Sequence, residues 1–279
     1  MYYFIITYIL LFIIIFIFLI NLYIKSPQII KTNNRYVTYK KINKNDDNDS
    51  NNDDDEDNAD NIFDPSKNRL YIYNLDRLDN QIIKLLKKVD ISKDFEIVIH
   101  SDGGYADNAI KIIYFMIRYK NKNKNKNKNT KIKAYVPYKA YSMACFIALI
   151  ADELYANEDS YFSQIDSQIP FQDRHYDYVS AHHLVSGKEK YLENYIKATI
   201  NEDQYITEKL IKSNKLRYTK EEWLNIMKYL MLEPKFTHDF NYTIDDMKYL
   251  GVKFDGNCPN SIVKIVDEFE EELEEVLEE

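Results

Sequence analysis

The sequence predicts an α/β layered fold with a mainly parallel sheet. Strand-like and helix-like segments alternate from residue 67 onward, which is the order expected when helices connect parallel strands. One predicted strand, residues 95–100, ends at the turn "SDGG", and another, residues 132–137, is followed by a helix that begins at Ser142. Active sites in such sheets gather at the carboxyl ends of the strands. The loops after these two strands are therefore where chemistry is expected.

The elements of this domain are predicted from hydrophobic periodicity and turn residues. The strands fall at residues 69–75, 95–100 and 132–137, with two short ones at 153–156 and 161–165. The helices fall at residues 78–90, at 107–120 and from 142 onward. The repeat "NKNKNKNKN", residues 121–129, is expected to be a solvated loop insertion and not a nucleic-acid patch.

Outside this domain the composition changes sharply and divides the chain into four parts. The predicted parts are a transmembrane anchor at 1–24, a disordered acidic tether at 25–66, the folded domain at 67–258 and an acidic amphipathic helix at 259–279. Residues 2–24 are almost wholly apolar and long enough to cross a hydrocarbon core about 30 Å thick. No basic segment precedes them and no small-residue cleavage site follows, which favours a retained anchor over a cleaved signal peptide.

The flanking segments also predict location and packing. Lysine and arginine follow the anchor but do not precede it, so the positive-inside rule places the globular part on the cytoplasmic side. The tether has few apolar groups to bury and a dense run of aspartate and asparagine, which is typical of disorder. In the C-terminal segment, apolar residues recur at helical spacing among glutamates, so this helix is expected to pack on the domain or, as in a coiled coil, on a partner.

Composition excludes several classes of function. The net charge of −8 argues against nucleic acid as the main partner, because a phosphate-binding protein needs a basic face. Two cysteines, Cys145 and Cys258, give neither a disulfide framework nor a metal knuckle, and Cys145 is expected to be a small buried hydrophobe. No HExxH pattern surrounds the adjacent His182 and His183. We therefore expect no metal and no cofactor.

Ser142 and the glycine pair after residue 100 are the first candidates for chemistry. Adjacent Gly103 and Gly104 permit a sharp turn whose N–H groups are not covered by side chains, and such groups can bind an oxyanion. Ser142 opens a helix, next to unpaired N–H groups such as that of Met143 and the positive end of the helix dipole. Together they fit an acyl-transfer site. The pattern alone is more typical of a serine that caps the helix and of a glycine pair that only turns the chain.

Four ordered segments resemble the serine dehydrogenase proteinase family, which is related to signal peptide peptidase A and has the Clp protease/crotonase fold. "IVIHSDGG" is similar to a strand that enters a His-(Ser/Thr)-Pro-Gly-Gly loop, with Asp102 in place of proline. "AYSMACFIALIADELYA" resembles Ala-x-Ser-Ala-Gly-Thr followed by Ala-Asp-Glu-Ile. "SQIDSQIP" resembles Gly-Pro-Ile-Asp-Pro-Gln, and "KFTHDFNYTIDDMKYLGV" resembles a Thr-His-Asp-(Tyr/Phe)-Pro-Ile segment. The resemblance covers residues 69–255.

The resemblance implies roles for individual residues. It assigns the nucleophile to Ser142 and the oxyanion hole to the amides of Gly103 and Gly104, with Met143 beside them. Membrane relatives use a lysine from a later helix as the general base, and such a lysine must be desolvated to lose its proton. In "VSGKEKYLENYIK" we prefer Lys188, and the other lysines available are Lys190 and Lys197.

Histidine is the alternative general base. His238 lies in the segment that resembles Thr-His-Asp, and the remaining candidates are His175, His182 and His183. The sequence does not choose between lysine and histidine.

The sequence therefore predicts a membrane-anchored serine peptidase that forms an acyl-enzyme on Ser142. Its substrates are expected to be extended peptides or membrane proteins, bound along a sheet edge by strand addition. The resemblance also implies a homo-oligomer. Two alternatives stay open, because Met143, Ala144, Ser163 and Gln164 replace small or proline residues of the family pattern. One is a catalytically inactive homologue that acts as a membrane-tethered scaffold, and the other is a crotonase-like acyl-CoA enzyme that would not need Ser142.

Overall fold

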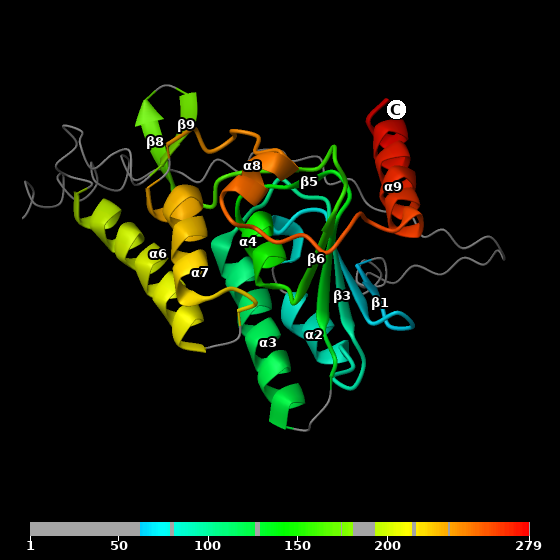
Figure 1. The fold of residues 1–279 in the computed structure, drawn as a ribbon. Coiled ribbons are helices and arrows are strands. Elements are labelled where there is room, and N and C mark those ends of the chain that lie inside the picture. The colour runs from blue at the N-terminus through cyan, green and yellow to red at the C-terminus, as the bar shows by residue number, and fades with distance from the viewer. Residues whose placement is uncertain are drawn as a thin grey trace, which may run out of the picture. The chain divides into compact units, whose positions relative to one another are not determined.

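The computed structural model describes residues 62–78, 81–125, 129–173, 175–180, 193–213, 216–233 and 235–278. The predicted anchor and all but the last residues of the predicted tether lie outside these ranges. Among the helices within them, none is both long enough and apolar enough to cross a membrane. The description that follows concerns the folded domain (Figure 1).

The domain is built on a five-stranded sheet in the order β1-β2-β3-β4-β6. Its strands are β1 (Phe63–Asp64), β2 (Arg69–Ile72), β3 (Phe95–Ile99), β4 (Ile132–Val136) and β6 (Glu153–Ala156). All neighbours pair in parallel except β1, which pairs antiparallel with β2. The predicted α/β fold with a mainly parallel sheet is confirmed.

Helices cover one face of this sheet. The connecting helices are α2 (Ile82–Lys88), α3 (Ala106–Asn125) and α4 (Met143–Ile150), preceded by a short 3₁₀ turn, η1 (Asp76–Leu78). Beyond them lie α6 (Glu193–Ser213), α7 (Lys220–Met227), the π-helical η3 (Lys228–Leu232) and α8 (Ile244–Tyr249). Every residue of α4 is buried, including Cys145, so this helix runs through the centre of the main core as its uniformly apolar sequence requires.

The last helix, α9 (Asn260–Glu278), packs on the opposite face of the sheet (Figure 1). Its buried residues Ile262 and Val266 contact a row of neighbouring side chains from four strands. That row consists of Tyr71, Val98, Tyr135 and Tyr155. The amphipathic helix predicted at 259–279 therefore exists, and within this chain it packs on the domain itself.

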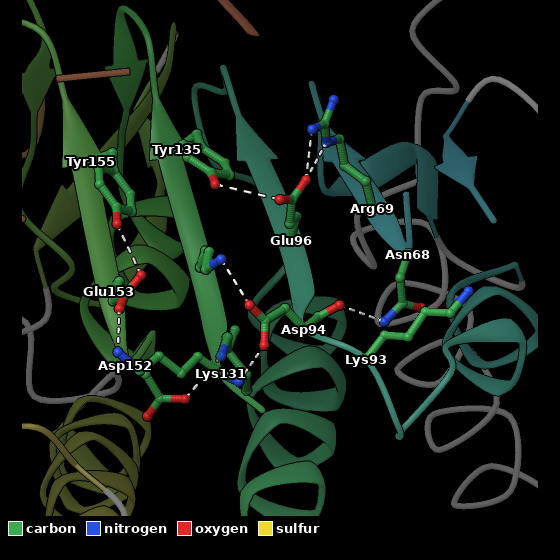
Figure 2. Close-up of polar contacts among 12 residues, drawn as sticks. Asn68, Arg69, Lys93, Asp94, Glu96, Lys131, Tyr135, Asp152, Glu153 and Tyr155 are labelled. Carbon is green, nitrogen blue, oxygen red and sulfur yellow. Dashed lines mark hydrogen bonds and ion pairs between the residues drawn. The ribbon is translucent and has the colours of Figure 1, made fainter. Parts of the chain in front are cut away.

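A row of charged side chains runs across the same sheet face, beside the residues that α9 covers (Figure 2). Its members are register partners on successive strands and alternate in sign: Arg69, Glu96, Lys133 and Glu153. The Arg69 guanidinium donates twice to Glu96 Oε2, at 2.8 and 2.6 Å. Lys133 pairs instead with Asp94, at 2.7 Å. Opposite charges across strands support the register that aligns the strand ends at the site.

Two predicted boundaries are corrected by the structure. The predicted tether ends at residue 66, but Phe63 is buried and pairs with Leu70, so the folded part begins earlier. A single apolar side chain in a polar segment gave no periodic pattern to detect. The repeat at 121–129 was expected to be a loop, but α3 continues through Asn125, and Asn123 is buried. Lysine has good helix propensity, so the repeat can extend a helix that is already nucleated.

Two small sheets complete the domain. β5 (Lys139–Ala140) pairs in parallel with β7 (Tyr161–Phe162), and β8 (Gln168–Asp173) forms an antiparallel hairpin with β9 (His175–Ser180). Strand β5 lies between β4 and α4 in the chain, just before Ser142, and its partner β7 follows β6. The β5–β7 pair is the element that brings the candidate site together.

Candidate active site

The two loops singled out from the sequence lie side by side. Ser101 forms a parallel bridge with Ala140, in which the Ser101 N–H donates to Lys139 O at 3.1 Å and the Tyr141 N–H donates to Ser101 O at 2.9 Å. The loop after β3 and the segment before α4 are therefore joined through their backbones. This pairing places the glycine pair against Ser142, as the order of the strands predicted.

Ser142 has a strained backbone and does not cap α4. Its φ is 51° and its ψ is −129°, a combination that L-residues rarely adopt. Its side chain makes no capping hydrogen bond to the helix, and within the described residues no other group bonds to its hydroxyl. A non-glycine residue held in such a conformation costs about 1–3 kcal/mol and is typical of functional sites. Between the two roles left open by the sequence, the geometry therefore favours the nucleophile.

Gly103 packs directly against this serine. A Cβ atom added to Gly103 would lie 2.7 Å from Ser142 Cβ, 2.9 Å from Tyr141 O and 3.3 Å from Ser142 Oγ. The φ of Gly103 is +100°, which also disfavours any side chain. Only glycine fits here, for both reasons. The close approach brings the backbone of the glycine loop to the serine hydroxyl.

The peptide unit between Gly103 and Gly104 has a fixed orientation. The carbonyl of Gly103 accepts a hydrogen bond from the Leu75 N–H at 3.1 Å. In a trans peptide the following N–H points the opposite way, so the Gly104 N–H points away from Leu75. Asp76 holds the next residue, since its carboxylate accepts from the Tyr105 N–H at 2.6 Å. A Cβ on Gly104 would collide with that carboxylate.

The backbone amides near the serine are not all available. The Gly103 N–H already donates to Ser101 Oγ at 3.1 Å, and the Ser142 N–H donates to Ser163 Oγ at 2.7 Å. The N–H groups of Gly104 and Met143 donate to no described residue. These two amides, at the turn and at the first residue of α4, are the free donors beside Ser142. Such donors can stabilise negative charge on an oxygen bound there.

The segment after β7 forms hydrogen bonds with Ser142 and with Tyr242. Ser163, which accepts the Ser142 N–H, also donates to Gln164 O at 3.1 Å. The Gln164 side chain donates to the Tyr242 hydroxyl at 3.3 Å, and Phe162 and Tyr242 exchange both backbone hydrogen bonds. Burial raises the pKa of Tyr242, which therefore stays neutral. Ser163 and Gln164, which depart from the family pattern, thus bond to Ser142 and to Tyr242 respectively.

His238 is paired with a buried carboxylate. Its Nδ1 lies 2.9 Å from Asp166 Oδ1, and the Asp166 side chain is fully buried while that of His238 is 28% exposed. The Gln168 side-chain nitrogen donates to the other oxygen of Asp166, Oδ2, at 2.9 Å, and it also lies 3.0 Å from His238 Nδ1. In this position the Asp166 carboxylate can accept a hydrogen bond from the Nδ1–H group of His238, which leaves Nε2 free to take a proton. A carboxylate so placed orients a catalytic imidazole.

None of the other candidate bases is described in contact with the Ser142 hydroxyl. Lys188 and Lys190 lie outside the described residues, as do His182 and His183. Lys197 lies on α6 with an exposed side chain, and His175 is in β9. The structure thus brings together Ser142, Gly103, Gly104 and Met143, and leaves the lysine base untested.

Several residues of the site were not predicted. They are Asp76, Ser163 and Asp166. Asp76 accepts from the Tyr105 N–H beside the glycine pair, Ser163 accepts from the Ser142 N–H, and Asp166 contacts His238. Asp166 stood within a segment already matched to the family, so its carboxylate was visible but had no assigned partner. Asp76 left no sequence pattern, because it acts on a loop 29 residues away.

Two comparisons with known proteins found similar sequences. A family model described as ClpP-like SDH-type serine proteinase matches residues 2–276. Two uncharacterised proteins of Methanocaldococcus jannaschii are each 24% identical, one over 195 residues and the other over 190. Each alignment covers 67% of this chain, and the chain spans 62% and 61% of the length of these relatives. The match over nearly the whole chain confirms the predicted family: this protein belongs to the ClpP-like SDH-type serine proteinases.

Proposed function

We propose that the protein is a serine endopeptidase that cleaves peptide bonds through an acyl-enzyme on Ser142. One observation carries the proposal: Ser142 has strained dihedral angles and a glycine backbone packed directly against it. The Ser142 hydroxyl adds to the scissile carbonyl while a base takes its proton. The carbonyl oxygen becomes an oxyanion. The carbon–nitrogen bond then breaks as the base gives its proton to the leaving amine, and water hydrolyses the acyl-enzyme that results.

The oxyanion is proposed to bind at the glycine loop and the start of α4. The free N–H groups of Gly104 and Met143 are the donors available there, and the positive end of α4 adds to their field. Gly103 supplies the close approach, and its own amide becomes a third donor when it releases Ser101 Oγ. Losing one oxyanion donor of this kind costs on the order of 10²–10³ in kcat.

For the general base we propose Lys188, by resemblance to membrane relatives, with Lys190 and His238 as alternatives. The observation that favours His238 is its contact with buried Asp166, since a paired imidazole has the orientation that proton abstraction needs. These candidates separate experimentally. Lys188→Met, Lys190→Met and His238→Gln each retain most of the side-chain volume, and the variant that lacks the base should lose about 10²–10⁴-fold in acylation rate.

Location and partners complete the proposal. The apolar segment 2–24 is proposed to anchor the protein in a membrane as a single span, with the folded domain on the cytoplasmic side. The family model also extends over this segment. Substrates are then peptides or membrane proteins near the bilayer, bound in extended form, and the protein is proposed to form a homo-oligomer. No nucleic acid is expected as a partner, given the net charge of −8.

The second candidate function is that of an inactive, membrane-tethered binding scaffold. The observation that favours it is that no described residue lies in hydrogen-bond contact with the Ser142 hydroxyl to take its proton. The two functions differ in one outcome. A scaffold would bind peptides without cleaving them.

Digestion of a defined peptide mixture, followed by mass spectrometry, tests the proposal. The wild-type chain should produce new termini, and Ser142→Ala should produce none. Ser92→Ala is the control, because Ser92 is exposed and its hydroxyl bonds to Asp90 in the turn before β3. Cleavage that persists in Ser142→Ala would contradict the proposed nucleophile, and a wild-type chain that binds the peptides without cleaving them would favour the scaffold.

A further inference from the structure

His100 is a buried histidine immediately before the loop that carries the glycine pair. Its side chain has an exposed fraction of only 9%, and its Nε2 lies 2.7 Å from Glu270 Oε1 of α9. Its Nδ1 is buried and has no hydrogen-bond partner among the described residues. Within the part of the chain that the structure describes, the contact with Glu270 is therefore the hydrogen bond that orients the ring.

The protonation state of His100 follows from these contacts. A carboxylate accepts but does not donate, so the Nε2 atom carries the proton of this hydrogen bond. Burial lowers the pKa of His100, although the charge of Glu270 acts in the opposite direction. The charge of Lys139 also lowers the pKa of His100, while the charge of Asp102 raises it. The Tyr138 ring packs edge-on against the imidazole. The pair is thus a neutral imidazole that donates to a carboxylate.

Two further contacts of α9 fall at equivalent places in the sheet. Phe269 stacks on Tyr73 with ring centroids 3.6 Å apart, and Asp267 accepts a hydrogen bond from the Tyr138 hydroxyl. Tyr73, His100 and Tyr138 stand one or two residues beyond the ends of β2, β3 and β4. The middle of α9, residues 267–270, therefore contacts residues just beyond the carboxyl ends of three neighbouring strands.

The three loops that begin at these contacts are the ones that build the candidate site. The loop after β2 supplies Leu75 and Asp76, which hold the glycine loop. The loop after β3 contains Gly103 and Gly104 themselves. The segment after β4 leads through β5 to Ser142. One helix thus touches the starting point of every one of these loops, on the sheet face opposite α4.

We propose that α9 acts as a clamp on residues 101–105, which we call the oxyanion loop, and that His100 and Glu270 are its positioning residues. This rests on the proposed function, because the loop matters to catalysis only if Ser142 acts as a nucleophile. Loss of the Glu270 carboxylate would leave two buried ring nitrogens unsatisfied, which favours displacement of the ring. Ser101, whose hydroxyl accepts the Gly103 N–H, is the next residue and would move with it.

Hydrogen–deuterium exchange of the full-length chain tests the clamp without requiring activity. Glu270→Ala should speed exchange of the amides in residues 101–105 by at least several-fold. Glu270→Gln should stay near wild type, because the amide oxygen still accepts from Nε2. Glu268→Ala is the matched control: Glu268 lies on the same helix but pairs only with exposed Lys264. Equal exchange in Glu270→Ala and wild type, or an equal change in Glu268→Ala, would overturn the clamp.

The rate of reaction with a fluorophosphonate probe gives the second readout. Glu270→Ala should react about 10- to 100-fold more slowly than wild type, because small misplacements of a catalytic group have effects of that size. Glu270→Gln should recover most of the rate. If the wild-type chain does not react at all, the proposed function fails, while the exchange experiment still decides the clamp. A normal reaction rate in Glu270→Ala would contradict the positioning role.

Discussion

Ser142→Gly is expected to stabilise the folded protein by about 1 kcal/mol while abolishing peptide hydrolysis. Ser142 has a φ of 51°, and its hydroxyl makes no hydrogen bond within the described residues, so glycine relieves strain and loses no described contact of the hydroxyl. Part of the gain is offset by the greater freedom of glycine in the unfolded chain. Urea denaturation of both proteins measures the change in the free energy of unfolding.

Asn68→Gly is the control for this prediction. Asn68 has a similar φ of 53°, but its side chain donates to Asp90 O and Asp94 O and accepts from the Asp90 N–H. Glycine at this position should therefore destabilise the fold, because those hydrogen bonds are lost. A Ser142→Gly protein that is clearly less stable than wild type would contradict the account, since it would mean that the serine side chain is structural.

Gly103→Ala is expected to reduce kcat/KM by at least about 100-fold, because a displaced oxyanion loop loses both positioning and charge stabilisation. The added Cβ would meet Ser142 Cβ at 2.7 Å and Tyr141 O at 2.9 Å. Neither atom is the end of a flexible side chain, so the two loops must separate. The fold should survive with a loss of about 1–3 kcal/mol. Peptide-cleavage kinetics and thermal unfolding together measure the two effects.

Gly251→Ala separates the collision from the backbone conformation. Gly251 has the same φ of +100°, but a Cβ there would meet nothing closer than Ile226 Cγ1 at 4.0 Å. This variant should lose stability and keep its activity. Equal losses of activity in both glycine variants would show that Gly103 acts through general stability and not through its contact with Ser142.

The parts of the fold with strong local patterns were predictable from the sequence. β6 (Glu153–Ala156) occupies the predicted range, and β3 and β4 end one residue before theirs. The neighbouring positions of the glycine loop and Ser142 also followed, because parallel strands place their carboxyl ends together. The strain at Ser142 did not follow, since dihedral angles depend on tertiary contacts such as the Ser163 bond.

Residues that act over long distances were the ones missed. The pairs His100–Glu270 and His238–Asp166 join positions more than 70 residues apart, and no local motif marks which residues pair. His238 was selected as a candidate base from the family pattern alone, and its orienting carboxylate became visible only in the folded chain. Single acidic residues in a chain with 45 of them carry too little information to be paired from sequence.

The central claim is that Ser142 is an activated nucleophile, and covalent labelling tests it most directly. The full-length chain is incubated with a fluorophosphonate, digested and mapped by mass spectrometry. The account predicts one adduct, on Ser142, that is absent from Ser142→Ala and retained in Ser92→Ala. No adduct on a folded wild-type chain would contradict it, and acyl-CoA binding that survives Ser142→Ala would then point to the crotonase-like alternative.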